Sequence, residues 1–309
     1  MKILYLDCGM GAAGDMLTAA LLELLPKREE FLEKMNTLMP EVEIRALPAE
    51  KCGITGTRVE VKIRGEEEES HDSAEGSHGE EAVHIHAHTH AHACGHTHPH
   101  EHLGSEARRG TVKSHACPHY HAHIHIEETG KNSHDHSHGC AGEHSHTHMS
   151  LHDIRTLING FDLPEKVRAD AIAVYELLAA AEAKVHGRPV GEVHFHEVGM
   201  YDAIADITAV CLLIYELAPD KIFASPIHVG SGRVRCAHGT LPVPAPAALE
   251  LLRGVPIYGG TIRGELCTPT GAALLKHFAD GFTPLPQIKT EAIGYGMGTK
   301  DFPSAPCVS

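Results

Sequence analysis

Two features are absent from the sequence and a third is scarce, and each excludes a class of protein. No run of about 18 consecutive apolar residues occurs, so we expect no membrane-spanning helix. The opening residues, MKILYLDCGMG, have no apolar core followed by a small-residue cleavage site, so we expect no secretory signal. Basic residues are few: 26 Lys and Arg stand against 41 Asp and Glu, and the net charge of −15 argues against nucleic acid or an anionic membrane as a partner.

Cysteine is also too sparse to indicate a disulfide scaffold. The chain has nine cysteines in 309 residues, an odd number without the density of small secreted domains. We therefore expect reduced thiols and a cytoplasmic location.

Histidine, in contrast, is abundant and concentrated in one segment. Of the 29 histidines, 23 lie between His71 and His152. Residues 66–148 are acidic and hold few large apolar side chains, so they cannot bury enough surface to offset the entropy of ordering. We predict a disordered, metal-binding insert at 66–148 between an N-terminal α/β lobe at 1–65 and a main α/β lobe at 149–309.

The insert contains a repeat whose units are centred on three cysteines spaced 23 residues apart. Each unit reads H-x-C-x3-H-x-H-x-H, and in an extended chain residues two apart project to the same side. Imidazole suits nickel, zinc, copper and iron, so the repeat predicts divalent-metal binding without selecting the metal; an inert low-complexity tract is the alternative. The candidate ligands are His92, Cys94, His98, His100, His115, Cys117, His121, His123, His138, Cys140, His144 and His146.

Outside the insert, helical and strand-like patterns alternate, which favours an α/β fold, with α+β as the alternative. Ser150 and Asp153 have the spacing of a capping box at the start of a helix. Pro164 and Gly187 are typical of the two ends of a long helix. The expected strands include Ile3–Leu6, 42–46 and 59–63, with KCGITG as turn material between the last two.

The first candidate site is LDCGMGAAGDM, in which Gly9, Gly11 and Gly14 follow a short apolar strand. The spacing matches a dinucleotide fingerprint, but no acid ends the following strand about 20 residues on, and Asp15 occupies the place of the pyrophosphate. Two alternatives remain. In the first, the loop is only a turn that packs a helix on a strand. In the second, the loop binds a ligand, which is either one phosphate or a metal held through Asp7 and Asp15.

The second candidate site is HFHEVGMYDAIAD. His194 and His196 are two apart on a predicted strand and so share a side, and Glu197 follows them. Asp202 and Asp206 are four apart on a predicted helix and share a face. The set suits a first-row metal, or an acid–base pair beside one; the alternative is two structural histidines and an N-cap acid.

The third candidate site is GELCTPTGAALL. Thr268 is predicted as an N-cap and Pro269 as the first residue of a helix. Backbone N–H groups at a helix start bind anions, within reach of Thr270 and Glu265. A capped helix with no ligand is an equally weighted alternative.

The strings YLDCGMGAAGDM, EVHFHEVGMYDAIADI, GELCTPTGAALL and GYGMGTKDF resemble the LarC family of nickel-insertion proteins, over almost all of residues 1–65 and 150–302. The resemblance implies a lyase-class enzyme that uses CTP, with Mg²⁺ or Mn²⁺, to insert Ni²⁺ into pyridinium-3,5-bisthiocarboxylic acid mononucleotide. The product would be the nickel-pincer nucleotide of lactate racemase and related enzymes, which are the recipients.

If the chain inserts nickel, as the resemblance implies, roles can be assigned to the candidate residues as hypotheses. Nickel–carbon bond formation removes a ring proton, so His194, His196 and Glu197 are candidates for the base and a transient nickel ligand. The Gly9–Gly14 loop or the Thr268 helix end would bind the substrate phosphate, and the repeats would load nickel. Family members commonly continue into a CTP-associated C-terminal region, so we expect this chain to be the N-terminal portion, either a natural short product or a truncated one, with turnover by the chain alone or only with a C-terminal fragment as the two alternatives. A non-catalytic nickel or zinc store, and a metal-dependent hydrolase, are the rival hypotheses.

Overall fold

A computed structural model of the chain describes residues 1–63, 66–67, 149–195, 201–236, 239–302 and 307–309, all of which belong to one compact unit. Apart from Glu66 and Glu67, the predicted insert lies outside the described residues, and so do all of its candidate metal ligands. The insert and its boundaries therefore stay predictions.

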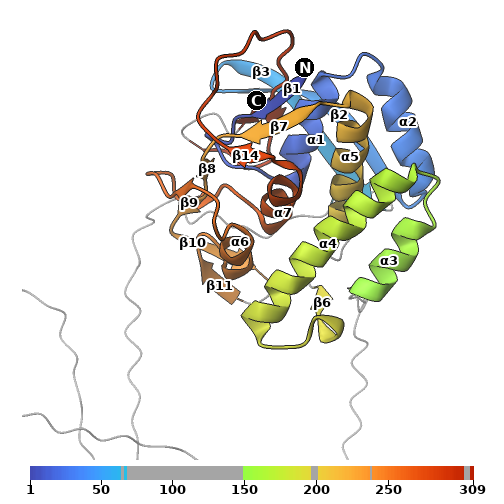
Figure 1. Cartoon of the computed structure of the whole chain (residues 1–309), viewed down its shortest axis with the longest axis vertical. Helices are drawn as coiled ribbons and strands as arrows, with labels where there is room; N and C mark the ends of the chain where they lie inside the picture. Colours follow the sequence, from blue (N-terminus) through green and yellow to red (C-terminus); the bar gives the residue numbers. More distant parts are fainter. Residues whose placement is uncertain (64–65, 68–148, 196–200, 237–238, 303–306) are drawn as a thin grey trace, which may run out of the picture. The chain divides into compact units, whose positions relative to one another are not determined.

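A parallel sheet of three short strands joins segments from opposite ends of the sequence. The strand order is β1 (Ile3–Leu6), β7 (Lys221–Ala224) and β14 (Gly281–Phe282), with Leu6 opposite Ala224. In β1 and β7 alternate residues are buried, as in a sheet with one covered face. Strands from both predicted lobes thus pair with each other, and α1, α5 and α7 contact one another beside them (Figure 1).

A second sheet is built on a long antiparallel hairpin. β2 (Val42–Lys51) pairs with β3 (Ile54–Ile63) over their full length, and β15 (Gly296–Met297) and β16 (Cys307–Val308) extend the sheet beyond β3. The strands run further than we predicted, into KCGITG, because the turn needs only Cys52 and Gly53. Both have positive φ, 50° and 77°, which suits a two-residue hairpin turn. β4 (Glu66–Glu67) also pairs with β3.

Two helices begin or end at the local signals that the sequence contains. Ser150 and Asp153 form the predicted capping box, Pro164 precedes α4, and Gly187 closes it in a left-handed conformation with φ 62°. The helices are α1 (Gly14–Glu23), α2 (Arg28–Leu38), α3 (Leu151–Asn159), α4 (Glu165–His186), α5 (Tyr201–Leu217), α6 (Pro246–Leu251) and α7 (Pro269–Phe278). None of the described helices is long and apolar enough to cross a membrane.

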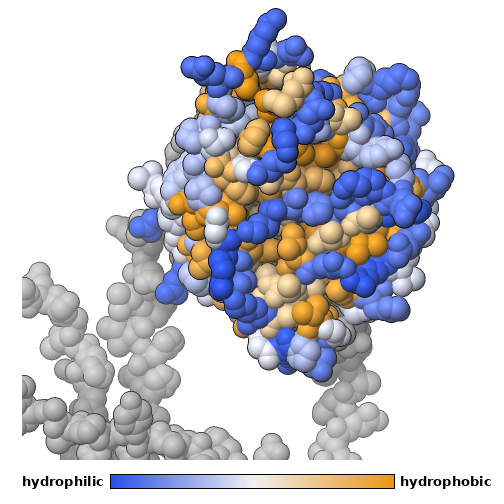
Figure 2. Space-filling view, in the orientation of Figure 1, coloured by the Kyte–Doolittle hydropathy of each residue, from blue (hydrophilic) through white to orange (hydrophobic). Residues whose placement is uncertain are grey.

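Helix α5 is the centre of the core. Every residue of 203–214 is buried except Asp206, which is partly exposed and is also the only charged residue in that stretch. α5 contacts α1, α4 and α7, so it links the N-terminal segment to the rest of the chain. Figure 2 shows apolar side chains between bands of hydrophilic ones on one face of the molecule. The mixed α/β class is confirmed.

Four pairs of short strands complete the described chain. β8 (Ile227–His228) is parallel to β12 (Ile257–Tyr258), with His228 opposite Tyr258. The other pairs are antiparallel: β9 (Gly230–Ser231) with β13 (Gly264–Glu265), β10 (Arg233–Cys236) with β11 (Gly239–Pro242), and β5 (Met149–Ser150) with β6 (His194–Phe195).

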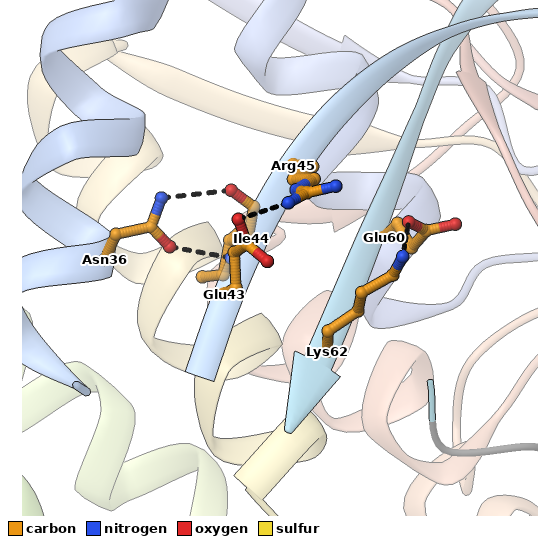
Figure 3. A network of polar contacts seen from close by, with 6 residues as sticks. All are labelled: Asn36, Glu43, Ile44, Arg45, Glu60 and Lys62. Atoms are coloured by element: carbon orange, nitrogen blue, oxygen red, sulfur yellow. Dashed lines mark hydrogen bonds and ion pairs between the residues drawn. The ribbon is translucent and has the colours of Figure 1, made fainter. Parts of the chain in front are cut away.

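One amide side chain closes the outer edge of the hairpin. The Asn36 Nδ2 group donates to the Ile44 carbonyl at 3.1 Å, and the Ile44 N–H donates to Asn36 Oδ1 at 2.7 Å (Figure 3). The amide thus acts as a one-residue neighbouring strand for β2 and binds α2 to it. The nearby pair Arg45–Glu43 is about half exposed, so it contributes little.

We expect Asn36→Ala to lower the free energy of unfolding by about 1–2 kcal/mol, because it leaves a partly buried N–H and C=O without partners. Thr37→Ala, at the next and exposed position of α2, is the matched control and should change it by less than about 0.5 kcal/mol. Urea unfolding of both variants checks this, and equal effects at the two positions would contradict it.

Candidate functional site

The strand ends of the parallel sheet bring distant segments together. Asp7 directly follows β1 and Ser225 directly follows β7. The Cys8 N–H donates to Ser225 Oγ at 2.8 Å, and the Ser225 N–H donates to the Leu6 carbonyl at 2.9 Å. This carboxyl edge is where open α/β sheets bind ligands.

The segment that leaves β1 is fixed on both sides by backbone hydrogen bonds. The Cys8 carbonyl accepts from the His228 N–H at 3.1 Å. Ala12 donates to the Leu266 carbonyl and accepts from the Thr268 N–H, each at 3.0 Å. Residues 8–12 therefore lie between β8 and the segment that leads into α7, while the Asp7 N–H donates to a Ser309 oxygen at 2.7 Å.

Close packing accounts for two of the three fingerprint glycines. Gly11 has φ 87°, and a Cβ there would lie 2.0 Å from the Leu266 carbonyl oxygen. A Cβ at Gly14 would lie 2.6 Å from Asp206 Oδ2. At Gly9 the contact is milder, 3.1 Å from Asp7 Oδ1, which accepts the Gly9 N–H. This geometry favours the turn that packs a helix on its neighbours; a phosphate-binding role for these glycines stays a prediction.

At the starts of α1 and α7, some of the backbone N–H groups that could bind an anion already have partners within the protein. The Asp15 carboxylate accepts the N–H groups of Met16 and of Asp15 itself. At α7 the predicted N-cap is confirmed, since Thr268 Oγ1 accepts the Gly271 N–H at 3.1 Å, and Pro269 has no N–H to offer. Binding roles for Thr268, for the buried Thr270 and for Glu265, which lies in β13, stay predictions.

Two carboxylates meet where α1 packs on α5. Burial, then the charges of Asp15 and Asp202, raise the pKa of Asp206 well above its ordinary value, and its Oδ1 has no hydrogen-bond partner among the described residues. Burial also raises the pKa of Asp15, to about 6, although its two backbone N–H groups and the charges of Lys300 and Arg58 oppose the change. The pair can therefore hold a proton near neutral pH.

The described residues contain no group of three or more His, Cys, Asp or Glu side chains that could hold a metal ion. Asp7, Asp202 and Asp206 are all described, so they do not form such a set by themselves. His196, Glu197 and the side chain of His194 lie outside the described part of the chain. The metal site predicted around those histidines stays a prediction.

The buried thiols are poor candidates for nickel ligands. Burial raises the pKa of Cys8 to about 12 and raises that of Cys267 well above its ordinary value. Metals bind the thiolate, so both residues are unreactive at neutral pH.

Sequence analysis missed a histidine–tyrosine stack at the same edge. The rings of His228 and Tyr258 stack with centroids 4.7 Å apart at 11°. His228 is buried, with Nδ1 3.0 Å from the Gly9 carbonyl oxygen and Nε2 3.1 Å from that of Gly259. No local pattern in PIHVG or PIYGG marks this contact, because it depends on the parallel pairing of β8 with β12.

A parallel sheet with polar side chains at its strand ends, and a partly buried carboxylate pair where α1 packs on α5, define an α/β protein with a candidate ligand site at the sheet edge. The family model described as nickel insertion protein matches residues 4–308, so the chain belongs to the nickel insertion protein family. No solved structure matches the chain.

Three curated relatives have the same name, pyridinium-3,5-bisthiocarboxylic acid mononucleotide nickel insertion protein. The chain is 42% identical to the Clostridium acetobutylicum protein, over 97% of the chain and 61% of the relative. It is 37% identical to the Clostridium kluyveri protein, over 97% and 59%, and 35% identical to the Geobacillus kaustophilus protein, over 100% and 58%. The chain thus spans about three fifths of the length of these relatives.

We expect Gly11→Ala to destabilise the fold by at least about 2 kcal/mol more than Gly53→Ala. Both glycines have positive φ, 87° and 77°, but nothing lies within 4 Å of a Cβ built at Gly53. The difference therefore isolates the close approach to Leu266. Thermal and urea unfolding without ligand measure it, and equal losses would mean that the loop is not closely packed.

We expect Asp206→Asn to gain stability relative to the wild type as the pH rises from 4 to 7.5. Raised pKa values of Asp15 and Asp206 mean that the folded wild type binds protons more tightly than the unfolded chain, so its stability falls as the pH rises through the folded pKa values. The relative gain should reach at least about 1 kcal/mol. Asp280→Asn is the control and should change little relative to the wild type across this range, because the Ile222 N–H and Lys221 lower the pKa of Asp280, which therefore stays ionised from pH 4 upward in the folded protein. Urea unfolding across this pH range checks both variants, and a pH-independent difference for Asp206→Asn would contradict the raised pKa.

Proposed function

We propose that this chain inserts nickel into pyridinium-3,5-bisthiocarboxylic acid mononucleotide, with nickel as a substrate. The observation that carries the proposal is the family match over residues 4–308, together with the shared name of relatives at 35–42% identity. The product would be the nickel-pincer nucleotide that lactate racemase and related enzymes receive, and the reaction would take place in the cytoplasm.

The reaction needs a group that removes a ring proton as the nickel–carbon bond forms. His194, His196 and Glu197 are our candidates for the base and a transient nickel ligand, because imidazole binds nickel and titrates near neutral pH. Asp15 and Asp206 form a second place where a proton can be held, beside the α1 turn. Asp202 would add negative charge there, and the histidine repeats would supply nickel.

The family resemblance also implies CTP with Mg²⁺ or Mn²⁺. The start of α1 does not fit a triphosphate, because the Asp15 carboxylate occupies two of its N–H groups and Gly11 and Gly14 are in close contact with Leu266 and Asp206. In this proposal CTP is used by the part of the relatives that this chain does not span. The proposed activity is of the lyase class, carried out by the chain alone or together with that C-terminal region.

The second candidate function is a nickel or zinc store without catalysis. The three H-x-C-x3-H-x-H-x-H repeats favour it, because they offer many imidazoles in a segment with little apolar surface. Storage does not require any residue of the folded part, which separates the two hypotheses.

The purified chain with Ni²⁺, Mg²⁺, CTP and the thiolated pyridinium mononucleotide should yield the nickel-loaded product by mass spectrometry, alone or with a C-terminal fragment of a relative added. Replacing His194 and His196 with Ala should abolish this product, because the proposed base and nickel ligand are lost, and the melting temperature of the variant shows that the fold is intact. His152→Ala, an exposed position on α3, is the control. Full activity in the double variant would refute the assignment of the base, and no product in any mixture would favour the metal store.

A further inference from the structure

Tyr258 presents one open aromatic face at the carboxyl edge of the parallel sheet. Its other face is covered by His228, yet 44% of the residue is exposed to solvent. The Tyr258 hydroxyl donates to the Gly9 carbonyl at 3.4 Å, so the ring lies next to the segment that leaves β1. An exposed ring that is already stacked on one side can accept a second planar group on the other.

The surroundings hold this ring in a fixed orientation. Both ring nitrogens of His228 lie about 3 Å from carbonyl oxygens, those of Gly9 and Gly259. A Cβ at Gly260 would lie 2.1 Å from His228 Nε2, so the backbone closes behind the imidazole. His228 therefore supports the Tyr258 ring rigidly from one side. Little conformational entropy is lost when a ligand stacks on the other side of Tyr258.

A negative charge lies near the Tyr258 ring. Asp7 is exposed, and the Gly9 N–H holds its Oδ1 at 2.9 Å. Burial and the negative charge of Asp7 raise the pKa of the Tyr258 hydroxyl, in keeping with the short connection from Tyr258 through Gly9 to Asp7. A carboxylate near an aromatic face attracts the positive charge at the nitrogen of a pyridinium ring stacked on that face.

We propose that Tyr258 and Asp7 form the subsite for the pyridinium ring of a mononucleotide, with the ring stacked on the open face of Tyr258 and its positive charge near the Asp7 carboxylate. This inference rests on the proposed function; it adds Tyr258, which no motif indicated, and gives Asp7 the role of positioning the ring. Tyr258 and Asp7 position the ring. Removal of the ring proton and binding of nickel belong to the residues proposed above for those roles.

Binding can be tested without nickel, so the result does not depend on insertion activity. Nicotinamide mononucleotide and its reduced form are suitable probes, because they share the ribose phosphate but only the oxidised form has a cationic ring. Calorimetry should show that the chain binds the oxidised form more tightly than the reduced form. Since the chain has no Trp and seven Tyr, quenching of tyrosine emission by the oxidised form is a second readout.

Three variants separate stacking from charge. Tyr258→Leu should weaken binding of the oxidised form about five- to thirtyfold, whereas Tyr258→Phe should keep most of it. Asp7→Asn should reduce the preference for the oxidised form. Tyr215→Leu is the matched control, because Tyr215 is similarly exposed, at 47%, but lies on α5.

Equal binding of the two nucleotide forms by the wild type, or no binding of either, would overturn the proposal. It would also be overturned if Tyr258→Leu and Tyr215→Leu bound the oxidised form equally well. Selective binding at Tyr258 without any nickel-loaded product would leave the subsite valid and refute the proposed function. If Tyr258→Leu formed the nickel-loaded product with an unchanged substrate KM, the proposed function would stand and the subsite would be refuted.

Discussion

The close approach of three backbone segments behind β1 is the constraint on which the rest of the structure depends. Residues 8–12 lie between β8 and the segment 266–268, and glycines remove the side chains that would keep them apart. A Cβ at Gly271 would lie 2.2 Å from the Ala12 carbonyl oxygen, so α7 must also start without a side chain at that point. Because of this packing, the start of α1 lies against α5, and Asp7, His228 and Tyr258 lie at one edge of the sheet.

Local structure was predictable because its causes are local. The capping box at Ser150, the Thr268 N-cap and the helix ends at Pro164 and Gly187 follow from side chains within a few residues of each other. The strand partners were not predictable, because β1 pairs with β7 and β14 from the far end of the chain. Parallel pairing leaves only weak short-range signals in a sequence.

The same distinction applies to the candidate site. Local spacing indicated Asp202 and Asp206 as a pair, but only the packing of α1 on α5 brings Asp15 to them and raises the pKa values. The glycine spacing was correctly recognised as a feature, and the structure favours packing as its cause at Gly11 and Gly14. The stack of His228 on Tyr258 gave no sequence signal. Within the proposed function, ring binding, proton transfer and nickel supply thus fall to separate parts of the chain.

A crystal structure of the chain with a bound pyridinium mononucleotide tests the central claim most directly, namely that the carboxyl edge of the β1-β7-β14 sheet binds the substrate. The account predicts that the pyridinium ring stacks on Tyr258, on the face away from His228, with the Asp7 carboxylate beside it. A nucleotide bound away from this edge, with Tyr258 still exposed to solvent, would contradict it.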